Sequence, residues 1–375
     1  MIVRTLGRTG LTVSQLGFGA MRLPMTEVDG QPRVDRELAI PMIHRAFAGG
    51  VTYIDTAVGY CHQDSQRVVG EALKGWREKI VVSTKNPYYG PDEAEWWKNL
   101  EDSLERLQVD CIDIYNHHGI RWQAYETEVA PRLSGWMRKA RDQGLIRHIC
   151  CSFHDSNAAL MQLVDSGYPE VITLQYNMLD RSLEEGIAYA HARGIGIVAM
   201  GPVGGGRLGA DSDVLASLIP GITRVPELAL RFVLANPHIS VALSGMSTMP
   251  QVEENLATCS DAISLSDDDK AAIAAHLARM RTLAELYCSG CAYCLPCPQA
   301  VKIPDIFRAY NMGRVYGLWD HARASYAGIG ASQWNPGAKA DACVACGDCE
   351  PKCPQKLDIR RQLAEARAAL AGESS

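Results

Sequence analysis

The sequence predicts an α/β protein in which a (β/α)8 TIM barrel is followed by a smaller helical domain. Short apolar runs alternate with longer amphipathic stretches eight times over the first two thirds of the 375 residues. An alternation of this kind over about 250 residues is typical of a (β/α)8 barrel. After about residue 287 the chain becomes rich in cysteine, which indicates a second domain.

The apolar runs are short enough to be buried strands. In chain order they are 15–19, 52–54, 80–83, 112–115, 148–151, 171–174, 195–199 and 241–243. Helical patterns lie between them. Trp97, Leu100, Leu104 and Leu107 recur at three- and four-residue spacing, which predicts one apolar helix face, and 228–234 forms another apolar helical stretch.

A doubly wound parallel sheet is the alternative architecture, because it also alternates strands and helices. Such folds often carry a glycine fingerprint with three glycines after the first strand. The Gly-x-Gly at 17–19 continues as Ala20-Met21-Arg22 and lacks the third glycine. The barrel is therefore favoured.

The domain organisation follows from these patterns. We expect the barrel at 1–264, a linking helix at 265–287 and the second domain at 288–375. Ser266 is a suitable N-cap for the linking helix, and acidic residues at 267–269 suit its first turn. Within the second domain, the long insert at 298–342 predicts additional helices.

Eight of the thirteen cysteines form two clusters, each of which ends in Cys-Pro. They are Cys288, Cys291, Cys294 and Cys297, followed by Pro298, and Cys343, Cys346, Cys349 and Cys353, followed by Pro354. Three cysteines at intervals of three residues, followed by a Cys-Pro, are typical of two-cluster ferredoxins. The second domain is therefore predicted to be ferredoxin-like and to bind two 4Fe–4S clusters.

In such modules the fourth cysteine of each group ligates the other cluster. This predicts one set made of Cys288, Cys291, Cys294 and Cys353, and another made of Cys343, Cys346, Cys349 and Cys297. A single cluster, or zinc, is the alternative, although zinc sites usually have two well-separated CxxC pairs. The clusters could carry electrons or only stabilise a small domain.

The composition excludes several functions. The formal net charge of −6 provides no basic footprint for nucleic acid. The sequence has no apolar run of the roughly 18 residues that a membrane helix needs, and its first residues do not resemble a signal peptide. The other cysteines have no disulfide-scaffold spacing, so a reducing cytoplasm is expected; they are Cys61, Cys111, Cys150, Cys151 and Cys259.

Ionisable residues follow three successive strands of the predicted barrel. Asp55 and Tyr60 follow the second, Lys85 follows the third, and His117 and His118 follow the fourth. Barrel enzymes place their catalytic groups at the carboxyl ends of strands, so these side chains are the candidate active site.

Five stretches of the chain, in order, resemble the aldo-keto reductases, and more particularly the branch of that family with a C-terminal iron–sulfur domain. The similarity extends from residue 1 to about 260. The matching stretches are 53–60, 82–85, 104–119, 174–181 and 253–256.

The resemblance implies that a hydride passes from a reduced nicotinamide to a carbonyl carbon while Tyr60 donates a proton to the oxygen. Lys85, held by Asp55, would lower the pKa of Tyr60, and His118 would orient the carbonyl. His117 is the alternative for the last role. Both histidines follow Asp113-Ile114-Tyr115, and the family's spacing from that motif selects His118.

The resemblance also implies a set of cofactor contacts, which includes a glycine-rich loop near the pyrophosphate. These contacts are Ser152, Gln175, Met200, Gly201, Val203, Gly205, Glu254 and Asn255.

Several positions depart from the family pattern. Phe153 replaces the usual asparagine beside the serine, and Met200 replaces an aromatic residue. Gly245 and Gln251 stand where many relatives have a lysine and an arginine that bind the 2′-phosphate of NADP. Either NADH or NADPH is therefore the expected cofactor.

Together, these features predict an oxidoreductase that interconverts a small-molecule carbonyl and an alcohol. A ferredoxin or another electron-transfer protein is the expected partner of the clusters. The alternative is an electron-transfer or redox-sensing subunit whose barrel binds nicotinamide or a partner with little turnover.

Overall fold

The computed structural model of the protein forms two compact units. The first comprises Met1–Gly204 and Ala229–Ser264, and the second comprises Gly205–Leu228 and Leu265–Ser375. The described residues are 1–209, 212–216, 218–219, 221–222, 224–260, 265–285, 288, 292–332, 335–353 and 356–371.

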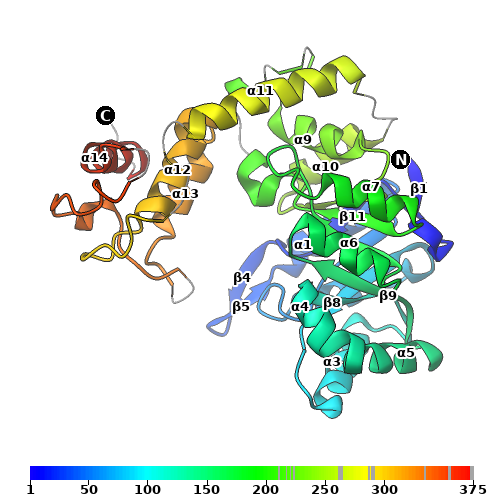
Figure 1. Ribbon diagram of the computed structural model, residues 1–375. Helices are drawn as coiled ribbons and strands as arrows, with labels where there is room; N and C mark the ends of the chain where they lie inside the picture. The colour runs from blue at the N-terminus through cyan, green and yellow to red at the C-terminus, as the bar shows by residue number, and fades with distance from the viewer. Residues whose placement is uncertain are drawn as a thin grey trace. The chain divides into compact units, whose positions relative to one another are not determined.

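The first unit is a closed barrel of parallel strands, as predicted (Figure 1). Around the barrel the strands are neighbours in the order β10-β11-β12-β3-β6-β7-β8-β9. All eight coincide with the apolar runs of the sequence, and closure excludes the doubly wound alternative. Their bounds are β3 (Leu16–Gly19), β6 (Tyr53–Asp55), β7 (Val81–Asn86), β8 (Ile112–Ile120), β9 (Ile146–Phe153), β10 (Val171–Gln175), β11 (Gly196–Met200) and β12 (Val241–Gly245).

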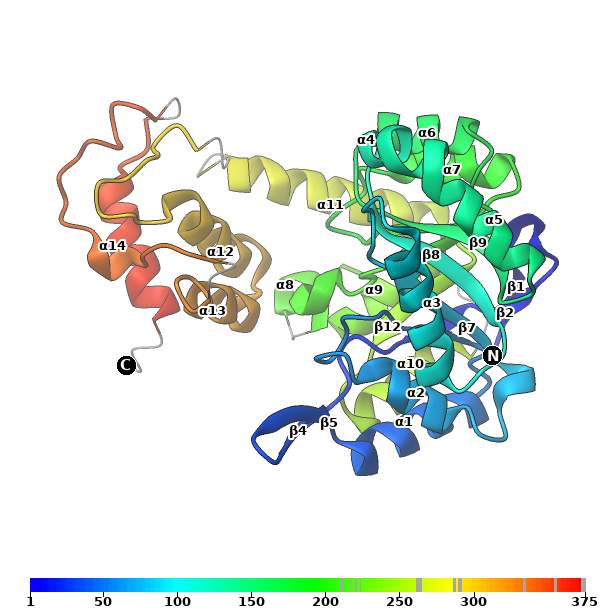
Figure 2. The ribbon, with the colours of Figure 1, turned by 90° about the horizontal axis from the view of Figure 1, so that it is seen from below.

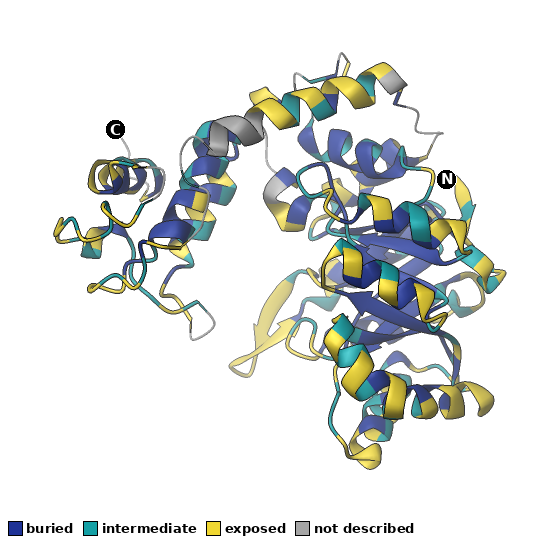
Figure 3. Ribbon diagram, viewed as in Figure 1, coloured by how far each residue is buried: buried dark blue, intermediate teal, exposed yellow. Residues whose placement is uncertain are grey.

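A helical segment follows each barrel strand, and buried helix faces line the strands (Figures 1 and 3). The helices are α1 (Arg36–Ala48), α2 (Ser65–Ala72), α3 (Glu93–Leu107), α4 (Trp122–Ala124), α5 (Ser134–Asp142), α6 (Asn157–Asp165), α7 (Glu184–Ala192), α9 (Val225–Leu234) and α10 (Met249–Cys259). Short 3-10 turns occur at Gly7–Thr9, Arg77–Lys79 and Gly204–Gly209, and a π-helical segment at Tyr125–Leu133.

The amino ends of the strands are closed by the antiparallel pair β1 (Val3–Thr5) and β2 (Thr12–Ser14). Leu6 and Val13 from this segment join the cluster of apolar residues that fills the barrel near the amino ends of its strands. Gly7 permits the close approach, because a Cβ there would lie 2.2 Å from the backbone nitrogen of Gly196. The functional groups are consequently confined to the opposite end.

A second antiparallel pair, β4 (Met25–Val28) and β5 (Gln31–Val34), projects from the barrel (Figures 1 and 2). The sequence did not indicate it. The strands are short and exposed except at Val34, so they lack the apolar alternation by which a half-buried strand is detected.

The apolar face of α3 differs by one residue from the predicted one. Leu100 and Leu107 are buried as expected, but Trp96 and Ser103 complete the buried face in place of Trp97 and Leu104, which are only partly buried. Trp96 faces Tyr115 of β8 at 6.1 Å between ring centroids. The spacing could not decide between Trp96 and Trp97, because these neighbouring aromatic residues lie four and three residues before Leu100 and both distances fit a helix face.

The second unit is helical. Its elements are α8 (Asp213–Ala216), α11 (Asp267–Glu285), α12 (Ile303–Tyr316), α13 (Trp319–Ala327), the 3-10 turn Ala340–Ala342 and α14 (Ile359–Leu370). The helices expected in the insert and the tail are therefore present. They share an apolar cluster that includes Ile306, Phe307, Tyr326 and Leu363. Among the described residues, no helix has the length and apolar character to cross a membrane.

Packing predicts different effects on stability for two glycine substitutions, one in this unit and one in the barrel. A Cβ on Gly313 of α12 would lie 2.3 Å from the indole of Trp319, so Gly313→Ala should destabilise the unit by about 1–3 kcal/mol. Gly135→Ala in α5 is the control, because no atom lies within 4 Å of its Cβ position, and it should be neutral or stabilising by up to about 1 kcal/mol. Urea unfolding measures both; equal effects would contradict this packing.

Candidate active site and cluster domain

The four residues of the candidate active site come from neighbouring strands. Asp55 ends β6 and Tyr60 follows in the next turn, Lys85 lies in β7, and His118 lies in β8. Side chains alternate between the two faces of a strand. Because Asp55 pairs with Ser83, two residues before Lys85, Asp55 and Lys85 point to the same side of the sheet.

Lys85 and Asp55 form a buried ion pair. The side chains are 1% and 6% exposed, and Lys85 Nζ donates to Asp55 Oδ1 and also, over 2.8 Å, to the carbonyl oxygen of Thr56. Burial alone would lower the pKa of Lys85, but the charge of Asp55 and contact with Tyr60 outweigh it and raise that pKa. Lys85 is therefore a fixed cation in this site.

Tyr60 lies beside this cation, with Lys85 Nζ 4.9 Å from the centroid of its ring. Burial raises the pKa of the Tyr60 phenol; the charge of Lys85 opposes this, and that of Asp55 reinforces it. Lys85 thus acts in the expected direction, but the net pKa is above the ordinary value because desolvation is the larger effect. Tyr60 is a protonated acid at neutral pH.

His118 is the histidine that faces Tyr60. Their rings meet edge to face with 5.9 Å between centroids. Burial, followed by the charge of Lys85 and by His154, lowers the pKa of His118 to about 4. The imidazole is consequently neutral at physiological pH and suited to hydrogen bonding rather than to charge.

His117 points to the other face of β8. Its Nε2 lies 2.8 Å from the hydroxyl of Tyr168, and its ring is fully buried. Burial lowers the pKa of His117 to about 3. The strand alternation separates the two adjacent histidines, and it leaves His117 in a packing role.

Two of the expected nicotinamide contacts continue around the same rim. Ser152 lies in β9 and Gln175 ends β10, where it pairs with Met200. The buried hydroxyl of Ser152 has no hydrogen-bond partner among the described residues. Gly201 has a φ of +63° and packs so closely on the Gln175 amide that a Cβ would lie 2.6 Å from Oε1. A buried hydroxyl without a hydrogen-bond partner is a suitable contact for a carboxamide ligand.

The remaining expected contacts differ in their exposure to solvent. Val203 is partly buried and Gly205 is exposed, with a φ of 68°. On α10, Glu254 is exposed, whereas Asn255 is buried and donates to Ser244 Oγ over 2.9 Å. One N–H of the Asn255 amide is therefore used within the protein.

Arg22 is a cation that lies near Gly245, the position at which many relatives have a lysine. The sequence did not indicate this proximity. A Cβ on Gly245 would lie 3.7 Å from Arg22 Cδ. Gln251 Oε1 accepts from the Ser247 amide over 2.8 Å, and Ser247 Oγ donates to the Arg22 carbonyl oxygen over 2.6 Å. Arg22 is distant in sequence from Gly245, so only the pairing of β3 with β12 brings them together.

The turn after Tyr60 has an unusual backbone. Cys61, His62 and Gln63 all have left-handed φ angles, of 50°, 54° and 68°. Non-glycine residues adopt this region at a cost, so the surroundings must hold the turn. Cys61 and His62 therefore act as parts of a constrained turn.

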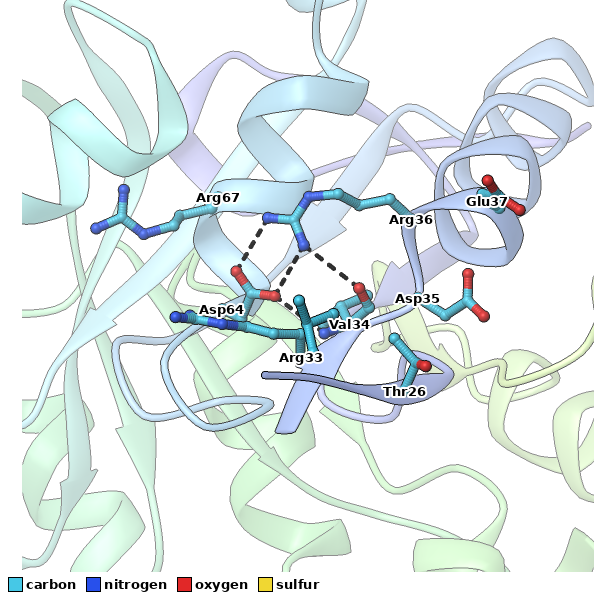
Figure 4. A pocket seen from close by; sticks show the side chains of 9 residues that line it. Thr26, Arg33, Val34, Asp35, Arg36, Glu37, Asp64 and Arg67 are labelled. Atoms are coloured by element: carbon cyan, nitrogen blue, oxygen red, sulfur yellow. Dashed lines mark hydrogen bonds and ion pairs between the residues drawn. The ribbon is translucent and has the colours of Figure 1, made fainter. Parts of the chain in front are cut away.

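Asp64 anchors the end of this turn (Figure 4). Its carboxylate accepts from both terminal nitrogens of Arg36 at 3.0 Å and from the Val34 amide at 2.9 Å. Burial would raise the pKa of Asp64, but the hydrogen bonds from Arg36 and Val34 lower it. These contacts lie on the wall of an open depression of about 750 Å³ and tie the β4–β5 pair to the turn after Tyr60.

In the second unit, five cysteines line one cavity. Cys297, Cys343, Cys346 and Cys349 form one of the two predicted ligand sets, and Cys294 belongs to the other. Of the other set, Cys288 and Cys353 are partly buried and Cys294 is buried, while Cys291 lies outside the described residues. Thiols are the ligands of iron–sulfur clusters, although among the described residues no three His, Cys, Asp or Glu side chains are placed closely enough to hold a single metal ion.

The buried His117 predicts a pH dependence of stability. Its folded pKa of about 3 is below the ordinary value of about 6.5, so the unfolded chain binds the extra proton and stability falls as the pH drops below about 6.5. His117→Asn should therefore reduce the loss of unfolding free energy between pH 7 and pH 5 by about 2 kcal/mol. Urea unfolding at both pH values tests this, with His62→Asn on the exposed turn as control; unchanged losses in His117→Asn would be contrary evidence.

Comparison with known proteins agrees with both units. Residues 15–217 match the model of the aldo/keto reductase family, and residues 287–358 match that of the 4Fe-4S dicluster domain. The chain is 30% identical over 295 residues to L-galactose dehydrogenase of Arabidopsis thaliana, covering 72% of this chain and 91% of that protein. It is 28% identical over 322 residues to the NADH-specific methylglyoxal reductase of Escherichia coli K12, covering 70% and 94%.

Among solved structures, the chain is similar to the holo form of the aldo-keto reductase AKR11C1 from Bacillus halodurans, with a TM-score of 0.63 and 28% identity. That similarity covers 74% of this chain and 96% of the other. The chain therefore belongs to the aldo/keto reductase family, as an NAD(P)-dependent oxidoreductase with a C-terminal 4Fe-4S domain.

Proposed function

We propose that the protein interconverts a small-molecule carbonyl and an alcohol by hydride transfer with NADH or NADPH. The observation that carries the proposal is the convergence of Tyr60, the Lys85–Asp55 ion pair and His118 at one rim of the barrel. When bound, the reduced nicotinamide supplies the hydride. Ser152 and Gln175 would hold its carboxamide.

The four side chains divide the remaining work. In the reducing direction the Tyr60 hydroxyl donates a proton to the carbonyl oxygen. Lys85 stabilises the resulting phenolate, because a cation beside a phenolate lowers its energy. Neutral His118 orients the oxygen by a hydrogen bond. In alcohol oxidation the Tyr60 phenolate takes the proton back.

The relatives suggest substrates for a first survey. One is named as an L-galactose dehydrogenase and another as an NADH-specific methylglyoxal reductase. We propose that the substrate of this chain is likewise a small oxygenated carbonyl or alcohol. The replacement of two cations by Gly245 and Gln251 favours NADH, whereas Arg22 beside Gly245 offers NADPH a cation.

We further propose three working parts: the barrel at 1–264, the linking helix at 265–287 and the cluster domain at 288–375, which would hold two 4Fe–4S clusters. When bound, such clusters supply one-electron transfer. A ferredoxin or another electron-transfer protein would be the partner. The thiolate ligands favour the reducing cytoplasm as the compartment.

Replacement of Tyr60 tests the catalytic proposal. Tyr60→Phe removes the proton donor, so reduction of methylglyoxal with NADH or NADPH, and oxidation of L-galactose with NAD⁺, should fall at least about 100-fold. Tyr189→Phe removes an exposed hydroxyl on α7 and is the matched control. Turnover by Tyr60→Phe at the wild-type rate would exclude the proposed mechanism and favour the electron-transfer alternative.

Iron analysis after anaerobic purification tests the clusters. The wild type should contain about eight iron atoms per chain, and Cys297→Ala should contain about four, because one ligand set loses a thiolate. Cys111→Ala, which changes a partly buried cysteine of the barrel, should keep the wild-type content. About four iron atoms in the wild type would indicate one cluster instead of two.

A further inference from the structure

The interior of the barrel changes from apolar to polar just below the candidate active site. The layer nearer the amino ends of the strands is apolar, and Ile114, Cys150, Val171 and Val198 are among its residues. One layer higher, four consecutive strands carry polar side chains that are at most 1% exposed; these are Ser83, Asn116, Ser152 and Thr173. Barrel interiors are usually filled by bulky branched residues, so this polar layer needs an explanation.

Ser83 contacts the oxygen of Asp55 that Lys85 leaves unused. Lys85 Nζ donates to Oδ1, whereas Ser83 Oγ donates to Oδ2 over 2.7 Å. A buried ion pair is stable only when its remaining polar atoms are also hydrogen-bonded. Ser83 supplies that missing bond.

Asn116 fixes the direction of the Ser83 hydroxyl. Its Nδ2 lies 3.1 Å from the carbonyl oxygen of Thr84, which can only accept a hydrogen bond, so the nitrogen must face this side. The same nitrogen lies 3.2 Å from Ser83 Oγ. Because Ser83 accepts this bond from Asn116, its own single proton is free to be donated to Asp55.

We infer that Ser83 and Asn116 are positioning residues, which hold the Asp55 carboxylate in the orientation that keeps the Lys85 ammonium beside Tyr60. The inference rests on the proposed function, because it concerns the proton donor of that reaction. Neither residue is expected to touch the substrate. Their effect passes through Asp55 and then through Lys85.

The charged and titratable groups around Tyr60 determine the expected sign of the effect. Asp55 faces Tyr60 from β6, Lys85 from β7 and His118 from β8, with His154 beyond His118. Of these, Lys85 is the cation that lowers the pKa of Tyr60. If Asp55 loses its orientation, Lys85 is held less firmly, and Tyr60 should ionise at a higher pH.

Alcohol oxidation provides the measurement, because it uses the Tyr60 phenolate and its rate rises with pH as Tyr60 ionises. The probe is L-galactose with NAD⁺, or the alcohol product of methylglyoxal reduction if the wild type prefers it. The valine side chain of Ser83→Val has the same shape as the threonine side chain of Ser83→Thr but lacks the hydroxyl group. We expect Ser83→Val to lower kcat about tenfold and to move the pH profile about one unit higher.

Three further variants make the result specific. Ser83→Thr keeps the hydroxyl and should keep the wild-type profile. Asn116→Leu leaves the Ser83 hydroxyl in place but undirected, so its shift should have the same sign and be smaller. Ser14→Ala removes a buried hydroxyl that donates to the Leu16 carbonyl oxygen and accepts from the Thr52 amide, at the opposite end of β6 from Asp55. It should leave the pH profile unchanged even if it lowers thermal stability.

NADH affinity, measured by quenching of protein fluorescence, should be unchanged in Ser83→Val and Asn116→Leu. Wild-type kcat and pH profiles in both variants, with an inactive Tyr60→Phe, would overturn the inference and leave the proposed function standing. An active Tyr60→Phe would instead overturn the proposed function. If Ser83→Val does not fold, Ser83→Ala and Asn116→Leu carry the same comparison.

Discussion

The buried ion pair between Asp55 and Lys85 is the interaction on which the active site depends. An ammonium group with 1% exposure is stable only beside a charge of opposite sign, and Asp55 is the carboxylate that supplies it. The pair fixes a cation next to the Tyr60 phenol in a site from which water is largely excluded. Desolvation alone would make Tyr60 a poor source of phenolate, and Lys85 partly offsets that effect.

The turn that carries Tyr60 is held from outside the barrel. Three successive residues in the left-handed region would not persist in a free loop. Asp64 closes the turn by accepting hydrogen bonds from Arg36 and from the Val34 amide, so the short β4–β5 pair acts as a brace. A segment that is mostly exposed and contributes little to the core thereby constrains the position of Tyr60.

Under the proposed function, the two units would supply different kinds of redox chemistry. Hydride transfer moves two electrons together, whereas an iron–sulfur cluster exchanges one at a time. The cluster unit has its own apolar core, to which Ile306, Phe307 and Leu363 contribute, so its fold does not rest on metal ligation alone.

The sequence by itself determined the architecture and indicated the candidate site residues. Period and length identified all eight barrel strands, because a buried parallel strand must be a short apolar run, and the cysteine spacing identified the cluster domain. The sequence also selected His118 over His117, and strand alternation in the structure places the former beside Tyr60.

Tertiary structure decided what depends on neighbours distant in the chain. The net pKa of Tyr60 is set by burial, which no local pattern reports. Arg22 meets Gly245 only because β3 pairs with β12, and Ser83 and Asn116 support Asp55 only because three strands lie side by side. A serine and an asparagine within apolar strands carry no sequence signal of their own, since their role consists entirely of hydrogen bonds to side chains on other strands.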